Sequence, residues 1–427
     1  MRRLIAVLAI AMTARLMAQA PDPFAAFFDA ADAATATAEA DKLLAGKVDF
    51  DTAYARLKQG RRYGDEKRGE YALRWRSRSG PFFNNIVNIP ADYDPASPIQ
   101  LRVQLHGGVA RPSPNAVAPG REAPGRGANR IEGERQIYLH PSGWADAQWW
   151  DEEQVDNIFH AVDALKRKYN IDESRIYITG ISDGATGVYY MALKAPTIWA
   201  SYLPLNGSIG VLANFQTGAD GEMYGNNFVN DPLYIVNGEQ DPLYPVAGVE
   251  PHIRWFRAMG VPFVFRPQAG AGHNTNWWPT ERAPYETFVH DHPRVPHPET
   301  LSWETERVDK FNRNRWLVID KLRRGEGPPA DPRLEDTGLF RHVLPSGRVD
   351  VTRTGNGFAA KTRGVAQFTL LLSPDAVDFS KPVTMTVNGK PVAIEPVRKD
   401  VAALLRWAAR DNDRTMLYGA ELKVAVP

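Results

Sequence analysis

Short apolar segments alternate with amphipathic ones through the middle of the chain. Apolar runs with the length of β-strands cover residues 99–105, 136–140, 175–179, 202–205, 233–236 and 262–265. Between the second and third runs, five apolar residues recur at helical spacing: Val155, Ile158, Phe159, Val162 and Leu165. A second helix is predicted from about residue 185 to 194, ending before Pro196. This alternation predicts the α/β class, with a mostly parallel sheet that carries helices on both faces.

Different patterns flank this central region. Residues 24–60 are Ala-rich at first and predict helix, while residues 71–76 and 85–89 predict a strand pair joined by a turn. After residue 298, extended runs dominate, and Asn388-Gly389 is a strong hairpin signal. One helix, at about residues 400–410, and a last strand near 421–426 close the chain. We therefore expect a helical N-terminal extension at 21–70, an α/β domain at 71–297 and a β-rich C-terminal accessory domain at 298–427.

The first 20 residues have the pattern of a signal peptide. Arg2 and Arg3 precede an apolar run at residues 4–12, and Ala18-Gln19-Ala20 has the small-x-small form of a cleavage site. No later stretch is apolar enough to span a bilayer, so we expect the mature protein to have no integral membrane segment. The sequence thus predicts export to a periplasmic or extracellular location.

Composition narrows the classes of chemistry. Lys plus Arg number 51 and Asp plus Glu number 50, a balance that gives no electrostatic footprint for nucleic acid. The chain has no cysteine, which excludes disulfides, thiolate nucleophiles and Cys-ligated metals. His290, His292 and His297 alternate with Asp291 and several prolines, a pattern that we interpret as an extended linker rather than a metal site. We expect neither a metal nor a cofactor.

A candidate nucleophile follows the predicted strand at residues 175–179. Gly180-Ile181-Ser182-Asp183-Gly184 is a G-x-S-x-G motif between a predicted strand and a predicted helix. In that context the motif forms a sharp turn that exposes the serine hydroxyl at the edge of the sheet. Ser182 is therefore the candidate nucleophile.

A serine nucleophile needs a base and a carboxylate that orients the base. His273 lies in Gly270-Ala-Gly-His, just past a predicted strand, and Asp241 lies in Gly238-Glu-Gln-Asp-Pro, just past another. The order Ser182, Asp241, His273 is that of a catalytic triad on an α/β sheet. Because ligand sites form at the carboxyl ends of parallel strands, these three residues are expected to meet. Glu239 is a competing candidate for the carboxylate.

An acyl-transfer site also needs hydrogen-bond donors for the developing oxyanion. The backbone N–H of Asp183 is one candidate, and His106-Gly107-Gly108 after the first predicted strand of the α/β pattern supplies the others, at Gly107 and Gly108.

These motifs resemble the secreted serine esterases of the α/β-hydrolase superfamily, in particular the polyhydroxybutyrate-depolymerase-like and feruloyl-esterase-like branch. The resemblance covers roughly residues 80–297 and includes the segment Ala147-Gln-Trp-Trp-Asp. It implies Ser182 as nucleophile, His273 as general base and then acid, Asp241 as the orienting carboxylate, and an acyl-enzyme intermediate. A carboxylate directly after the nucleophile departs from the family pattern, so the side chain of Asp183 must point away from the oxyanion or be paired.

The resemblance implies an ester substrate, including one linked to a polymer or polysaccharide, and Trp277 and Trp278 are candidate substrate-binding residues. Two alternatives remain open at this point. One is a serine peptidase of the prolyl-oligopeptidase type without its propeller, and the other is a non-catalytic binding protein on a hydrolase scaffold.

Overall fold

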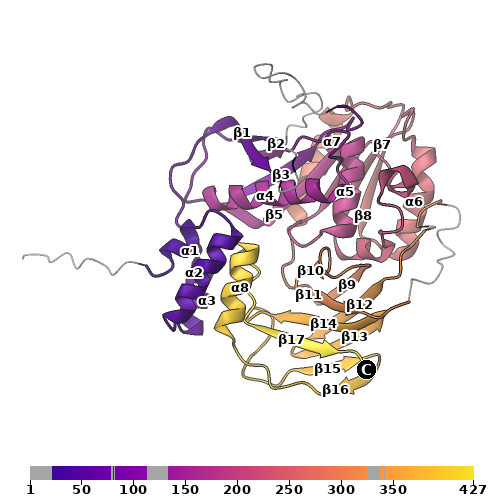
Figure 1. Ribbon diagram of the computed structural model, residues 1–427. Helices are drawn as coiled ribbons and strands as arrows, with labels where there is room; N and C mark the ends of the chain where they lie inside the picture. The colour runs from indigo at the N-terminus through magenta and orange to yellow at the C-terminus, as the bar shows by residue number, and fades with distance from the viewer. Residues whose placement is uncertain (1–21, 78–79, 81, 113–132, 326–336, 341) are drawn as a thin grey trace, which may run out of the picture.

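The computed structural model describes residues 22–77, 80, 82–112, 133–325, 337–340 and 342–427. The predicted signal peptide therefore lies outside the described residues. Figure 1 shows a layered α/β body above a pair of smaller sheets, with the N-terminal helices beside the last helix of the chain.

An eight-stranded sheet forms the centre of the α/β body. Its strands are β1 (Gly69–Arg76), β2 (Phe82–Ile89), β3 (Ile99–Leu105), β4 (Ile137–His140), β5 (Ile171–Ile181), β6 (Tyr202–Leu205), β7 (Leu233–Gly238) and β8 (Phe263–Gln268). The spatial order is β1-β2-β4-β3-β5-β6-β7-β8. β2 pairs antiparallel with both β1 and β4, and all other pairs are parallel. The predicted mostly parallel sheet and the strand pair at its start are confirmed.

Four helices cover this sheet: α4 (Glu152–Lys168), α5 (Asp183–Lys194), α6 (Val246–Met259) and α7 (Trp278–Asp291). Side chains along β5 alternate between two core clusters, as the period of a strand requires. Ile176 and Ile178 join a cluster that contains residues of α4, α5 and α6, whereas Tyr177 joins a cluster that contains residues of α7. The sheet therefore carries helices on both faces, as predicted.

Two of these helices were not expected, because each contains a proline. Pro251 lies inside α6 and Pro284 inside α7. A proline removes one backbone donor and usually ends a helix, but burial of one face of each helix against the sheet outweighs that loss here. The interpretation of residues 290–297 as an extended linker is wrong at its start, since His290 and Asp291 form the last turn of α7.

The C-terminal region contains two further sheets. Its strands are β9 (Thr300–Thr305), β10 (Arg313–Asn314), β11 (Leu317–Leu322), β12 (Gly347–Thr354), β13 (Gly357–Arg363), β14 (Val365–Leu372), β15 (Thr384–Val387), β16 (Lys390–Val392) and β17 (Ala420–Ala425). One sheet has the order β10-β11-β14-β17 and the other β16-β15-β13-β12-β9. Apolar residues from both sheets, including Trp303 and Phe368, form one buried cluster. The hairpin predicted at Asn388-Gly389 joins β15 to β16.

The two ends of the described chain share a third cluster. α1 (Ala25–Asp29), α2 (Ala33–Ala45) and α3 (Phe50–Gln59) pack with α8 (Val401–Asp411), as Figure 1 shows. The predicted N-terminal helical segment is divided where Asp32 and Asp49 cap the second and third helices by accepting backbone N–H groups. The N-terminal extension is therefore packed mainly against a C-terminal helix.

Buried and half-buried ion pairs join the C-terminal region to the α/β body. Arg294 bonds Asp413 at 2.7 Å, Arg414 bonds Glu173 at 2.8 Å, and Arg315 pairs with Asp231. Such pairs fix relative position because an unpaired charge in these places would be costly.

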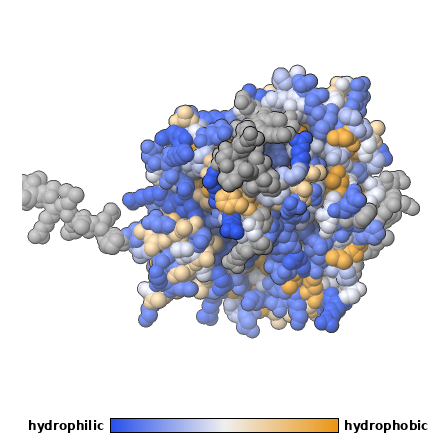
Figure 2. Space-filling view, turned by 45° about the horizontal axis from the view of Figure 1, so that its top comes forward, coloured by the Kyte–Doolittle hydropathy of each residue, from blue (hydrophilic) through white to orange (hydrophobic). Residues whose placement is uncertain are grey.

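The surface seen in Figure 2 is mostly hydrophilic, with hydrophobic residues in small, scattered groups. Within the described ranges, no helix is both long enough and apolar enough to cross a bilayer.

Candidate active site

Ser182 occupies a sharp turn between the end of β5 and the start of α5. Its backbone has φ 59° and ψ −122°, in the positive-φ region that non-glycine residues rarely adopt. Such a conformation costs on the order of 1–3 kcal/mol and persists only where the surroundings enforce it. The N–H of Ser182 donates to the carbonyl of Leu205 on the neighbouring strand at 3.0 Å. The turn therefore holds the serine side chain at the carboxyl edge of the sheet.

The two glycines of the motif are required by close packing. A Cβ added at Gly180 would overlap the backbone of Gly184, and a Cβ at Gly184 would overlap the carbonyl of Leu105 at the end of β3. The spacing G-x-S-x-G is thus a steric condition for the turn from β5 into α5.

His273 and Asp241 are in direct contact. The Nδ1 atom of His273 lies 2.7 Å from Oδ2 of Asp241, and the side chain of Asp241 is fully buried while that of His273 is 25% exposed. Oδ1 of Asp241 accepts the backbone N–H groups of Leu243 at 2.8 Å and Tyr244 at 2.9 Å. With both oxygens bonded, the carboxylate is fixed and presents one oxygen to the imidazole.

Glu239, the competing carboxylate, bonds elsewhere. Its Oε2 accepts the backbone N–H of Gly270 at 3.0 Å, and the residue is exposed. This contact joins the loop after β7 to the loop after β8, which carries His273. The geometry favours Asp241 as the partner of the imidazole.

Asn206 and Gly207 connect the serine turn to the histidine loop. Nδ2 of Asn206 donates to the carbonyl of Asn274, next to His273, at 2.7 Å. A Cβ added at Gly207 would lie 2.8 Å from the carbonyl oxygen of Ser182. Asn206 is buried and has φ 48°, a left-handed conformation that asparagine tolerates better than most residues. Sequence reasoning missed this residue, although an Asn-Gly pair at the end of a strand was a visible signal.

Tyr244 gives a second link between the two halves of the site. Its ring centroid lies 5.9 Å from that of His273. Burial raises the pKa of its hydroxyl, and the negative charges of Asp183 and Asp241 raise it further. Tyr244 therefore lies within electrostatic reach of the residue after Ser182 and of the carboxylate that bonds His273.

Gly107 lies against the serine. A Cβ added at Gly107 would be 2.8 Å from Cβ of Ser182 and 3.4 Å from its Oγ, so only glycine lets this backbone approach so closely. Gly108 adopts φ 72°. The structure thus brings the His106-Gly107-Gly108 loop beside Ser182. The other candidate oxyanion donor, the N–H of Asp183, belongs to the first turn of α5, where backbone N–H groups lack helical partners.

The carboxylate of Asp183 is paired. Its Oδ2 accepts the backbone N–H of Val109 at 2.9 Å, which ties the first residue of α5 to the loop that carries Gly107 and Gly108. The side chain of Asp183 was expected to point away from the oxyanion or to be paired. It is paired, because its carboxylate bonds a backbone N–H.

His106 is held as a neutral ring. Its Nε2 accepts the N–H of Gly143 at 3.0 Å, and its Nδ1 lies 2.8 Å from the carbonyl of Gly107, a contact that requires a proton on Nδ1. Burial lowers the pKa of His106. Trp149 supports the same loop by donating Nε1–H to the carbonyl of His106 at 2.8 Å.

Trp277 and Trp278 lie just after the histidine loop. Trp277 is only 7% exposed and packs in the cluster beneath α7, and the ring of Trp278 packs edge-on against Trp277 and Tyr285. The start of α7 at Trp278 turns these residues toward the sheet, so Trp277 offers little ring surface to a ligand.

In the part of the chain that the structure describes, no group of three or more His, Asp or Glu side chains is arranged to hold a metal ion.

The mostly parallel eight-stranded sheet, its flanking helices and the serine turn fit an α/β-hydrolase fold. No family model and no curated protein matches the chain. Solved structures with similarity include a thermostable esterase, at 19% identity over 53% of this chain with a TM-score of 0.40. That match spans 63% of the esterase, which is less than two thirds of its length.

In two other similar structures, the matched region spans almost all of the solved chain. S-formylglutathione hydrolase (FrmB) from Staphylococcus aureus has 19% identity, covering 53% of this chain and 99% of its own, with a TM-score of 0.39. Thermogutta terrifontis esterase 2 phosphorylated by paraoxon has 15% identity, covering 54% and 97%, with a TM-score of 0.41. Identities and TM-scores this low do not assign an activity to the chain.

Proposed function

We propose that the protein is a serine hydrolase that cleaves carboxylic esters. The observation that carries this proposal is the fixed Asp241–His273 pair on the same sheet edge as Ser182, which occupies a turn with φ 59°. Asn206 and Gly207 contact both the serine turn and the loop that holds His273. A hydroxyl, an imidazole and a buried carboxylate in this order are the parts of a catalytic triad.

In the proposed mechanism, Ser182 Oγ attacks the ester carbonyl while His273 Nε2 accepts its proton. Asp241 stabilises the imidazolium that forms, since its Oδ2 faces Nδ1 of His273. His273 then returns the proton to the alcohol that leaves, and an acyl group stays on Ser182. Water, activated by the same imidazole, releases the acid and restores the hydroxyl.

The negative oxygen of the tetrahedral intermediate needs preorganised donors. We assign this role to the N–H of Asp183 and to the N–H groups of the Gly107-Gly108 loop, which lies against Ser182. The loss of one such donor typically lowers turnover ~10²–10³-fold.

The motifs and their resemblance support a polyhydroxybutyrate-depolymerase-like or feruloyl-esterase-like substrate, in which the ester belongs to a polymer or a polysaccharide-linked acid. The pattern of residues 1–20 supports export to the periplasm or the medium. Residues 298–427 form an accessory region in this proposal.

The test uses a fluorophosphonate probe and a panel of short acyl esters and aminoacyl-anilides. We expect the wild-type protein to be labelled and to hydrolyse esters faster than anilides, and Ser182→Ala to lose both labelling and turnover. Ser208→Ala, at the residue that caps the 3-10 helix Ile209–Ala213 just after Gly207, is the matched control and should stay labelled. Labelling that survives in Ser182→Ala would refute the assignment of the nucleophile, and faster cleavage of anilides would point to a peptidase.

A further inference from the structure

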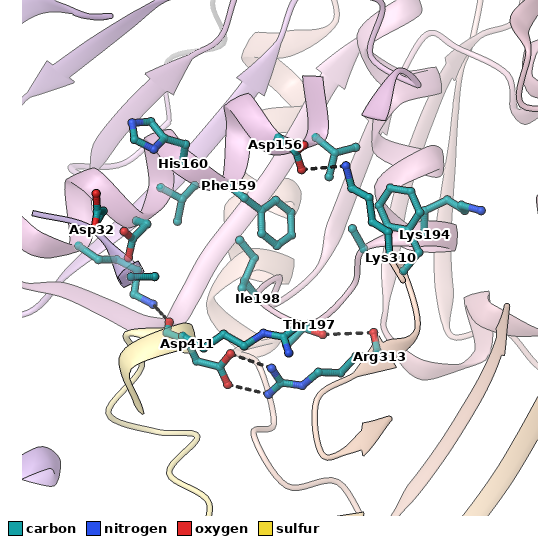
Figure 3. A pocket seen from close by; sticks show the side chains of 18 of the residues that line it. Asp32, Asp156, Phe159, His160, Lys194, Thr197, Ile198, Lys310, Arg313 and Asp411 are labelled. Atoms are coloured by element: carbon teal, nitrogen blue, oxygen red, sulfur yellow. Dashed lines mark hydrogen bonds and ion pairs between the residues drawn. The ribbon is translucent and has the colours of Figure 1, made fainter. Parts of the chain in front are cut away.

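A cavity of about 530 Å³ lies away from the serine turn, where three parts of the chain meet. Its wall is formed by the start of α2, one face of α4, residues 194–198, residues 310–313 and the end of α8 (Figure 3). The volume is within the range of pockets that take small molecules, and junctions between structural units are a common place for them.

The middle of the cavity is apolar. Phe159 of α4 and Ile198 lie at its centre in Figure 3, between the charged groups, and Val155 and Phe311 add further apolar surface. These side chains, apart from the buried Val155, are only half-buried. The cavity therefore offers apolar contact area that the protein itself leaves uncovered.

Most charges in the wall have partners of opposite sign. The pairs are Lys310 with Asp156 at 2.9 Å, Arg313 with Asp411 at 2.6 and 2.7 Å, Lys194 with Glu306 at 2.6 Å, and Asp163 with Arg167 at 2.8 Å. Asp32 is an exposed helix cap that accepts the N–H of Thr35 at 2.7 Å. These groups are satisfied without a ligand.

Two cations of the wall differ from the rest. Lys166 is only 4% exposed, and its Nζ donates to the backbone carbonyl of Asp411 at 3.0 Å. The guanidinium of Arg410 lies over the ring of Trp407, 4.9 Å from its centroid. Among the described residues, no carboxylate lies within ion-pair distance of either cation; the buried Asp413 bonds Arg294, and Lys166 acts on it only through its charge, which with that of Arg294 lowers the pKa of Asp413. A buried ammonium with unused donors favours an anion beside it.

We propose that this cavity binds a small amphipathic carboxylate, with its apolar chain along Phe159 and Ile198 and its carboxylate at Lys166 and Arg410. With Lys166 and Arg410 the wall carries more positive than negative side chains, which favours an anion. The apolar centre favours a ligand with a hydrocarbon chain or ring over an inorganic ion. This site is separate from the serine turn, and the inference does not depend on the proposed ester hydrolysis. Because α2, α4 and α8 all contribute to the wall, the ligand stabilises their packing.

The test measures binding of octanoate, octan-1-ol and octylamine to the full chain by calorimetry and by thermal unfolding. We expect octanoate to bind and raise Tm, and the alcohol and the amine to bind at least tenfold more weakly. Lys166→Met, which keeps the length of the side chain, and Arg410→Gln are each expected to weaken octanoate about tenfold. Ala34→Trp, at the exposed rim on α2, should block the cavity and abolish binding.

Arg406→Gln is the matched control, since Arg406 is an exposed arginine of the same helix and bonds Glu421 outside the cavity. It should bind octanoate as the wild type does. The proposal is overturned if octylamine binds as tightly as octanoate, if octanoate does not bind at millimolar concentration, or if Arg410→Gln and Ala34→Trp both bind with unchanged affinity. The last two variants change exposed residues, so a folding defect in Lys166→Met would leave the test intact.

Discussion

Asp183 joins two parts of the candidate site that are far apart in sequence, and its role can be separated from that of Ser182. Asp183→Ala removes the acceptor for the N–H of Val109, so the loop with Gly107 and Gly108 loses one of its anchors. We expect kcat for ester hydrolysis to fall by up to ~10²-fold with KM little changed, since misplaced donors act on the transition state. Asp183→Asn keeps an acceptor oxygen and should retain most activity. Equal kcat in the wild type and Asp183→Ala would contradict this role.

Asn206 positions the histidine loop through its bond to the carbonyl of Asn274. In Asn206→Asp the side chain can no longer donate, so we expect a lower kcat at unchanged fold. Asn206→Ala should in addition lose ~1–2 kcal/mol of the free energy of unfolding, because alanine resists the left-handed φ of 48°. Chemical denaturation and steady-state kinetics measure the two effects separately. If Asn206→Gly matched the wild type in kcat, the bond to Asn274 would have no positioning role.

Single residues also mark the limits of prediction from sequence. Ser182, Asp241 and His273 stood out because each follows a strand in a recognisable motif, and parallel strands bring such positions to one edge. The Asn206-Gly207 pair was visible in the sequence, but the contact of Asn206 with Asn274 spans 68 residues, so no spacing rule identifies that partner. Trp277 looked available beside His273, but the helix that starts at Trp278 turns it into the core.

The loop after β3 depends on a neutral imidazole, which makes its contribution to stability sensitive to pH. Burial lowers the pKa of His106 below its ordinary value of 6.5, so the unfolded chain takes up a proton more readily than the folded one as pH falls below 6.5. The stabilisation by His106 is therefore present above pH 6.5 and declines below it. We expect the difference in unfolding free energy between the wild type and His106→Gln to shrink from pH 8 to pH 5. Denaturant titrations across that range check it, and a difference that grew on acidification would contradict it.

Entire elements were predicted well where the pattern was local. β6 matches its predicted range, and α4 and α5 differ from theirs only at the ends. α6 and α7 escaped prediction because Pro251 and Pro284 interrupt their patterns, and packing against the sheet decides their conformation. The order of the strands, by contrast, follows from long-range pairing that the alternation of strands and helices does not specify.

Across the molecule, buried charges hold the C-terminal region against the α/β body. Arg294 is 3% exposed and bonds Asp413, Thr415 and the carbonyl of Thr197. Burial alone would raise the pKa of Asp413, but the positive charges of Arg294 and Lys166 together with hydrogen bonds from Thr415 and Arg294 outweigh it, and the net shift is downward. Arg294→Met leaves that carboxylate buried without its partner, so we expect a loss of ~3–5 kcal/mol in the free energy of unfolding.

The matched double variant distinguishes a charge effect from lost packing. Arg294→Met with Asp413→Asn removes both charges and should recover part of the loss, as measured by denaturation at neutral pH. Arg406→Gln, at an exposed ion pair, should change stability by less than ~0.5 kcal/mol. No recovery in the double variant would mean that the pair contributes through shape alone.

The packing of α2 and α3 on α8 has a consequence for the folding of the chain during its synthesis. α2 and α3 share their apolar cluster with residues that follow about 350 positions later in the chain, Ala403, Leu404 and Leu405. Until α8 has been synthesised, the faces of α2 and α3 that pack on it, which include Ala40 and Leu57, lack that part of their cover. A chain truncated before residue 401 would leave these faces of α2 and α3 uncovered and expose the segment to proteases and aggregation.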